Sequence, residues 1–296
     1  MKIGLGTVQF GMDYGVSNQD GMTPPSEVSA ILQYAWANDI TLLDTAAAYG
    51  NCEDILGQTI PANSSFKVVT KTPIFSNQKI KNQDATDLLN AFHNSLRKLN
   101  QPSLYGLLVH HSGDLLKDDG EYLWNAMRGL KDQGFVEKIG ASVYSPLEID
   151  GLVDRYPLDL IQLPLNVFDQ RMLITGQLQH LKSRGIEIHS RSVFLQGLLL
   201  MAQEDAPSYF DNIKSHMKRY RDEMEKQGIT PIKAALAFVF NLTEIDSIII
   251  GVNNKKHLEE IVLASACIGT LNKTDFSPYA IMEEHIINPS LWKITV

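Results

Sequence analysis

Short apolar runs alternate with longer amphipathic segments along the whole chain. The runs are rich in Ile, Val and Leu, and this alternation is typical of parallel strands joined by crossover helices. Eight strands are predicted, at residues 2–6, 41–44, 67–71, 105–110, 138–142, 160–163, 187–189 and 247–250. Eight such units are enough to close a sheet into one barrel.

The amphipathic segments have the period of helices. In residues 84–99 the apolar stripe consists of Leu88, Leu89, Phe92, Leu96 and Leu99. A second stripe, in residues 121–133, consists of Leu123, Trp124, Met127 and Leu130, and Gly134 supplies a C-terminal stop. Such stripes should cover the outside of the sheet.

The predicted fold is therefore an α/β (β/α)8 TIM barrel that spans residues 1–296 as a single domain. A length of 296 residues suits it, because barrels of this type need about 250. An open doubly wound sheet is the alternative, but its GxGxxG phosphate fingerprint is absent and the early GLGTVQFG does not have its spacing. Residues 195–208 follow a strand without a predicted element, and such loops usually serve the active site.

Composition narrows the function classes. The net charge is -8 with a pI near 5.5, and no Lys and Arg cluster is dense enough to follow a nucleic acid backbone. No segment approaches the roughly 20 apolar residues of a membrane helix, and the N-terminus lacks the apolar core of a signal peptide. The two cysteines, Cys52 and Cys267, are far apart, which fits a reducing compartment. We expect a cytoplasmic protein that binds neither nucleic acid nor membrane.

Four polar residues stand where the predicted strands end: Asp44, Tyr49, Lys71 and His110. In a barrel these ends converge on one pocket. Reduction of a carbonyl needs a proton for the oxygen, and an unperturbed tyrosine, with a pKa of about 10, is a poor acid at neutral pH. Lys71 can lower the pKa of Tyr49, while Asp44 keeps the lysine charged. His110, as neutral imidazole or as imidazolium, can donate a hydrogen bond to the substrate oxygen.

These residues also carry a family resemblance. DTAAAYGNCEDILG, VVTK and LYGLLVHH resemble the Asp, Tyr, Lys and His tetrad of the aldo-keto reductases, and EKIGASVYSP, LIQLPLNVFDQR and SIIIGVNNKKHLEEI resemble their cofactor-binding segments in the same order. The resemblance implies reduction of a small aldehyde or ketone, such as a sugar-derived carbonyl compound, with NAD(P)H as hydride donor. It also implies that Ser142, Gln162 and Asn166 surround the nicotinamide carboxamide.

The sequence departs from the family pattern at the cofactor contacts. Val143 stands where many members have Asn, and Arg191 stands where the family places an aromatic residue. A guanidinium can stack on the nicotinamide ring or bind the pyrophosphate. The phosphate-reading Lys, Ser and Arg of the family correspond here to Gly251, Val252 and His257.

The remaining cofactor positions follow the last predicted strand. Asn253 belongs to the same loop, and Lys255 and Lys256 are its nearby cations. Because these lysines and the start of the next helix can bind a 2'-phosphate, NADPH is expected, with NADH as the alternative. The chain also begins directly at the first barrel strand, without the N-terminal hairpin that closes the barrel floor in relatives, so other side chains must close it.

Other readings of the same residues lead to other functions. A non-catalytic NADPH-binding sensor is one alternative, and a lyase that forms a Schiff base on Lys71 is another, although a lysine paired with Asp44 is a weak nucleophile. His111 is expected in a loop or at the rim, because neighbouring strand residues point to opposite faces and cannot both enter one pocket. No metal site is expected, and the mixed-sign segment 214–228 is expected to form an exposed helix.

Overall fold

The computed structural model describes residues 2–18, 20–268 and 274–293. Its eight strands are all parallel and close into a barrel in chain order. They are β1 Ile3–Gly6, β2 Leu42–Asp44, β3 Lys67–Lys71, β4 Leu104–Val109, β5 Val136–Ser142, β6 Leu160–Pro164, β7 Glu187–Arg191 and β8 Ser247–Gly251. The predicted TIM barrel is confirmed, with strand ends within about two residues of the expected positions.

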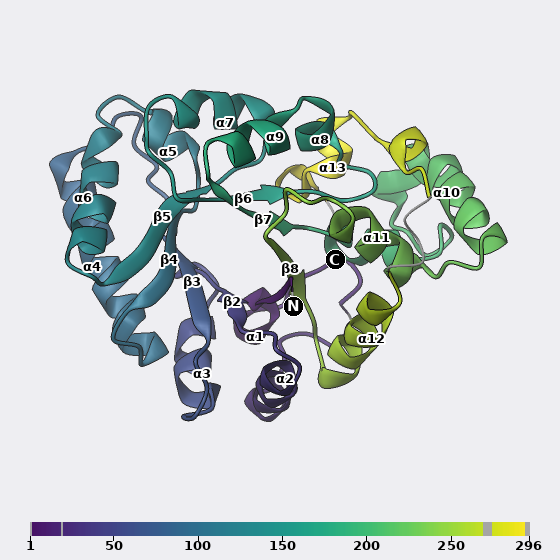
Figure 1. Cartoon of the computed structure of the whole chain (residues 1–296), viewed down its shortest axis with the longest axis horizontal. Coiled ribbons are helices and arrows are strands. Elements are labelled where there is room, and N and C mark those ends of the chain that lie inside the picture. Colours follow the sequence, from purple (N-terminus) through teal and green to yellow (C-terminus); the bar gives the residue numbers. More distant parts are fainter. Residues whose placement is uncertain (1, 19, 269–273, 294–296) are drawn as a thin grey trace.

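Helices surround the barrel (Figure 1). The α-helices are α1 Val8–Gly11, α2 Pro25–Ala37, α3 Cys52–Thr59, α4 Asn82–Leu99, α5 Gly113–Leu116, α6 Glu121–Asp132, α7 Pro146–Val153, α8 Arg171–Ile174, α9 Gln177–Ser183, α10 Lys214–Lys226, α11 Pro231–Phe240, α12 Lys255–Ala266 and α13 Glu284–Ile287. Short 3-10 helices are η1 Leu195–Leu200, η2 Ser208–Ile213, η4 Ser277–Tyr279 and η5 Pro289–Leu291. Within the described ranges, none of the helices could span a bilayer.

The predicted apolar stripes face the barrel. In α4 the side chains of Leu88, Phe92, Leu96 and Leu99 are buried, and in α6 those of Leu123, Trp124, Met127 and Leu130 are buried. Gly134 has a φ of +78° just after α6, a conformation that glycine adopts without strain. The helix therefore ends where the sequence indicates.

The inside of the barrel has its own small apolar layer. It consists of Leu42, Val69, Leu108, Leu160 and Ile249 and is separate from the main core between strands and helices. Side chains alternate across a strand, so the residue two positions later on each strand faces the same interior. Those residues are Asp44, Lys71, His110, Gln162 and Gly251. The site therefore lies directly above the apolar layer, at the carboxyl ends of the strands.

A charged network lies at the opposite end of the barrel and closes its floor. The Tyr105 hydroxyl donates to both carboxylate oxygens of Glu187, at 3.0 and 2.8 Å. Lys138 pairs with the same carboxylate, as does the His189 Nε2 at 2.6 Å. The ammonium of Lys67 lies 4.6 Å from the centre of the Tyr105 ring. These side chains, from β3, β4, β5 and β7, occupy the end of the barrel that a hairpin closes in relatives.

Candidate active site

A buried ion pair forms the base of the site. Lys71 Nζ donates to both carboxylate oxygens of Asp44 at 2.8 Å and to the carbonyl oxygen of Thr45 at 2.9 Å. Gln162 Nε2 donates to the same carboxylate at 2.7 Å. The side chains of Lys71 and Asp44 are 1% and 6% exposed. All three N–H groups of the ammonium are therefore directed at oxygen atoms, which does not suit a Schiff-base nucleophile.

Tyr49 and His110 complete the predicted group of four. The Lys71 Nζ lies 5.2 Å from the centre of the Tyr49 ring, and the Tyr49 and His110 rings meet edge to face with centroids 5.9 Å apart. Together with Asp44, these residues line one cavity. The structure thus brings together all four side chains that the sequence singled out as catalytic candidates.

Burial sets the protonation states of these groups. Burial, with a further contribution from Asp44, raises the pKa of Tyr49 above its ordinary 10. The expectation of a more acidic phenol does not hold, because desolvation of the phenolate and the Asp44 charge outweigh the opposing charge of Arg191. Burial, with the Lys71 charge, lowers the pKa of His110 to about 4. At neutral pH both groups are therefore uncharged: a phenol that retains its proton and a neutral imidazole.

Close backbone packing fixes the position of Tyr49, a feature that the sequence analysis missed. A Cβ added at Gly11 in α1 would lie 2.0 Å from the Tyr49 carbonyl oxygen and 2.6 Å from the Cys52 Cβ. A Cβ at Gly50, whose φ is +58°, would lie 2.3 Å from the Gly11 carbonyl oxygen. Only glycine fits such contacts, so α1 and the loop after β2 are in direct backbone contact beside the phenol.

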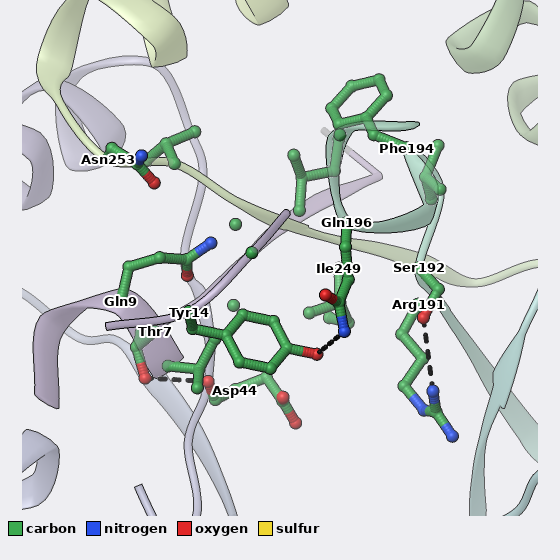
Figure 2. Close-up of a pocket in the computed structure, with 18 of the residues that line it drawn as sticks. Thr7, Gln9, Tyr14, Asp44, Arg191, Ser192, Phe194, Gln196, Ile249 and Asn253 are labelled. Atoms are coloured by element: carbon green, nitrogen blue, oxygen red, sulfur yellow. Dashed lines mark hydrogen bonds between the residues drawn. The ribbon is translucent and has the colours of Figure 1, made fainter. Parts of the chain in front are cut away.

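The cavity has a volume of ≈ 340 Å³, within the range of small-molecule sites. Five of the expected cofactor residues line it: Ser142, Gln162, Arg191, Gly251 and Asn253. Arg191 donates to the Val143 carbonyl oxygen at 3.0 Å and to the Ser192 hydroxyl at 3.3 Å (Figure 2). Its guanidinium lies 4.2 Å from the centre of the Tyr144 ring. In this structure the ring under the guanidinium belongs to the protein itself.

Three expected cofactor residues do not line the cavity. Asn166 is buried in the turn after β6, where its amide donates to the Ser192 carbonyl oxygen at 3.0 Å and its Oδ1 accepts from two backbone N–H groups. Lys255 pairs with Glu259 at 3.3 Å. Lys256 is exposed on the first turn of α12. Asn166 can therefore act on the site only through the loop that it supports.

Loops from distant parts of the chain form the rim. Gln196 Nε2 donates to the Tyr14 hydroxyl at 3.0 Å (Figure 2), and Asn253 Nδ2 donates to Asn18 Oδ1 at 2.7 Å. We call residues 13–18 the strap, because this segment connects the loop after β7 to the loop after β8. As expected, the segment 195–208 borders the cavity. The strap itself was missed, since its Gly, Asn and Asp residues indicated only a loop.

The structure also describes His111 and the mixed-sign segment outside the site. His111 lies in the loop after β4, with an exposed side chain that faces Asp114 at 3.6 Å. Residues 214–226 form α10, in which Glu223 and Lys226 lie 3.8 Å apart. Among the described residues, no group of three metal-ligating side chains is clustered.

The polar groups of the cavity fit a dinucleotide. The side-chain carbonyl oxygens of Gln9 and Gln162 are buried in its lining and accept no hydrogen bond within the described chain. Such acceptors suit the amide and hydroxyl groups of a nicotinamide nucleotide. Gly6 and Gly251 leave bare backbone beside them, which allows close approach of a ligand.

Comparison with known proteins shows the family of this chain. The model of the aldo/keto reductase family matches residues 2–282. The chain is 26% identical over 239 residues to the aldo-keto reductase YhdN of Bacillus subtilis (strain 168), covering 78% of this chain and 70% of that protein. It is 25% identical to the 6-dehydroglucose reductase of Agrobacterium fabrum (strain C58 / ATCC 33970), covering 62% of this chain and 66% of that protein.

Solved structures share the fold. The holo form of the aldo-keto reductase AKR11C1 from Bacillus halodurans has a TM-score of 0.71 at 17% identity and covers 96% of this chain and 94% of its own. The glycerol dehydrogenase AKR11B4 from Gluconobacter oxydans has a TM-score of 0.66 at 19% identity, with 93% of both chains covered. The chain therefore belongs to the aldo/keto reductase family and is an oxidoreductase that acts on carbonyl groups.

Proposed function

We propose that this protein reduces a small aldehyde or ketone to an alcohol, with Tyr49 as proton donor. The observation that carries the proposal is the placement of Tyr49, His110 and the Lys71–Asp44 pair around one cavity. Aldo-keto reductases generally use NAD(P)H, and the bound cofactor supplies the hydride to the carbonyl carbon. The protein residues then have to orient the carbonyl and deliver one proton to its oxygen.

Each side chain has a separate task in this scheme. Neutral His110 donates a hydrogen bond that orients the carbonyl oxygen and stabilises its developing negative charge. Tyr49 transfers its hydroxyl proton to that oxygen as the carbon accepts the hydride. The Lys71 ammonium offsets the charge of the phenolate that forms, and Asp44 holds the ammonium in place. The phenolate regains its proton from solvent before the next turnover.

The residues that line the cavity supply the proposed cofactor contacts. The carbonyl oxygen of Gln162 accepts no bond within the described chain and can receive the carboxamide N–H beside Ser142. Arg191 uses two of its five N–H donors on the protein, which leaves donors for the dinucleotide. Gly251 and Asn253 line the cavity after β8 and would contact the adenosine half of the dinucleotide. Asn166 supports the Ser192 backbone behind them.

The finer assignments extend the same proposal. Residues 1–296 act as one domain on a small-molecule carbonyl substrate, and the protein works in the cytoplasm, which suits the buried thiol of Cys52. The expected preference for NADPH depends on Lys255 and Lys256. Neither lysine lines the cavity, so the choice between NADPH and NADH depends on other groups near the start of α12.

The test is a comparison of binding and turnover. Purified protein is titrated with NADPH and with NADH by nucleotide fluorescence, and loss of nucleotide absorbance is followed across a panel of aldehydes and ketones. In Tyr49→Phe, kcat should fall about 10²–10⁴-fold while nucleotide affinity stays nearly unchanged, because the hydroxyl acts on the substrate oxygen. The control is Tyr122→Phe, since Tyr122 is an exposed tyrosine of α6. Full turnover in Tyr49→Phe would overturn the mechanism.

The same measurements separate the alternatives. A sensor would bind nucleotide without turning it over, but the complete group of four and the reductases among the relatives do not favour that role. A Schiff-base lyase would leave a covalent adduct on Lys71 after borohydride treatment with a carbonyl compound. We expect no adduct, because Asp44 and Thr45 hold that ammonium.

A further inference from the structure

The lining of the cavity extends from the catalytic group to α12. Tyr49, Lys71 and His110 contribute to it, and so do His257, Glu260 and Ile261 of α12. If the proposed function is correct, the nicotinamide lies beside Tyr49, so the adenosine half of the dinucleotide lies toward α12. The charges around the start of this helix then determine whether the adenosine ribose can carry a 2'-phosphate.

Two of the first three N–H groups of α12 already donate to side chains of the protein. Free N–H groups in the first turn of a helix attract anions such as phosphate. Here the Lys255 N–H donates to Oε1 of Glu27 at 2.6 Å, and the His257 N–H donates to Oδ1 of Asn254 at 2.9 Å. Glu27 belongs to α2, which packs beside α12 (Figure 1). A carboxylate from another helix thus takes the place of an external anion.

The ammonium group of the lysine at the start of this helix is paired with a carboxylate as well. The Lys255 ammonium pairs with Glu259 at 3.3 Å and lies 5.5 Å from the centre of the Tyr34 ring. Glu260, on the same helix, lines the cavity. The first two turns of α12 and the adjoining Glu27 therefore carry three carboxylates, of Glu27, Glu259 and Glu260, and two ammonium groups, of Lys255 and Lys256. A ribose hydroxyl can donate to such carboxylates, whereas a phosphate of charge near -2 is repelled.

We infer that Glu27 is a specificity-determining residue that excludes the 2'-phosphate, so that the protein prefers NADH to NADPH. This inference depends on the proposed function, because it presumes a dinucleotide in the cavity. It reverses the preference that Lys255 and Lys256 indicate in the sequence. The reversal arises from Glu27, which is 228 positions from Lys255 in the chain.

The test measures nucleotide affinity without catalysis. Dissociation constants for NADH and NADPH are determined by calorimetry for the wild type, for Glu27→Gln and for Glu121→Gln, a remote control on α6. The wild type should bind NADH about 10-fold more tightly, since like charges in contact are costly. Glu27→Gln keeps an oxygen for the Lys255 N–H but removes the charge. It should strengthen NADPH binding at least several-fold and leave NADH binding nearly unchanged, whereas Glu121→Gln should behave as wild type.

Fragments and salt sharpen the comparison. 5'-AMP and 2',5'-ADP differ only in the 2'-phosphate and lack the nicotinamide. 5'-AMP should therefore bind more tightly than 2',5'-ADP to the wild type, and Glu27→Gln should reduce this difference in affinity. Added salt should also reduce the difference in affinity between the two nucleotides, because a charge repulsion at a partly exposed helix end is screened. Thermal unfolding of each variant confirms that it is folded.

Two results would overturn the inference: wild type that binds NADPH as tightly as NADH, or a Glu27→Gln variant whose ratio of affinities is unchanged. If neither nucleotide binds to the folded wild type, the proposed function fails instead, so the two failures are distinguishable.

Discussion

At the scale of single residues, burial decides the chemistry of the site more than the neighbouring charges do. Tyr49 stays a phenol because a buried phenolate is poorly solvated, and His110 stays neutral for the same reason and because Lys71 is close. A proton donor that retains its proton at rest, and a neutral hydrogen-bond donor beside it, suit a reaction in which negative charge develops on the substrate oxygen.

The pH profile of reduction should therefore be flat through the ordinary range of histidine titration. Because the pKa of His110 is lowered to about 4, kcat/KM should show no titration near pH 6.5. It should fall only as the pH approaches 4. The free energy of unfolding should also depend on this group. Because the unfolded chain binds the His110 proton more readily than the folded chain does, the contribution of His110 to stability is lost as the pH falls from 6.5 toward 4. Rates across pH 4.5–9 check the first part. A rate that titrates near 6.5 in the wild type and not in His110→Gln would contradict it.

The four catalytic candidates could be predicted from the sequence because each lies at or just after a strand, and strand ends of a barrel meet at one face. Their pKa values could not, because desolvation depends on the loops that cover them. The Glu27 carboxylate at the start of α12 and the contact of Gly11 with Tyr49 join residues far apart in the sequence. A single sequence carries no pattern for such pairs.

At the scale of elements, α1 supports the loop after β2 that carries Tyr49. It is a single turn without a side-chain cap, yet its end packs against the backbone of Tyr49 and Cys52. The Cys52 thiol lies 3.1 Å from the Thr7 carbonyl oxygen just before α1. These contacts tie the first loop of the barrel to the second.

Gly11→Ala should accordingly damage catalysis without contacting the substrate. The added methyl group would lie 2.0 Å from the Tyr49 carbonyl oxygen, so the loop must move, and a shift of about 1 Å in a catalytic group can cost about 10²-fold in rate. Turnover and circular dichroism measure the effect. The matched control is Gly129→Ala in α6, where only the flexible end of Gln133 lies within 4 Å. This control should keep its activity and gain about 1 kcal/mol of stability. Equal losses of activity in both variants would contradict the supporting role of α1.

At the scale of the whole molecule, the barrel interior contains three levels: a charged floor, an apolar layer and the site. Burial alone would raise the pKa of Glu187, but three hydrogen-bonding partners, His189, Lys138 and Tyr105, lower it to about 2. The Glu187 carboxylate is thus the centre of the floor and connects β4, β5 and β7.

Acid should therefore lower the free energy of unfolding of this protein by protonating Glu187 in the floor of the barrel. A carboxyl group with a lowered pKa in the folded state contributes stability that is complete above about pH 4.5 and is lost as the pH falls toward 2. Glu187→Gln should lose about 1.5–3 kcal/mol at pH 7 and show a shallower decline between pH 4.5 and 3. Urea unfolding at several pH values measures both. Parallel declines in the variant and in the wild type would show that Glu187 is not responsible.

The alternation of side chains along β7 has a practical consequence. Glu187 belongs to the floor, and Arg191, four residues later on the same strand, lines the cavity, with the apolar layer of the barrel between these levels. Because that layer insulates one end from the other, substitutions made at both ends should combine additively. Substitutions in the floor that raise stability to acid or heat can therefore be combined with substitutions around the cavity that change substrate preference, and each set can be optimised independently of the other.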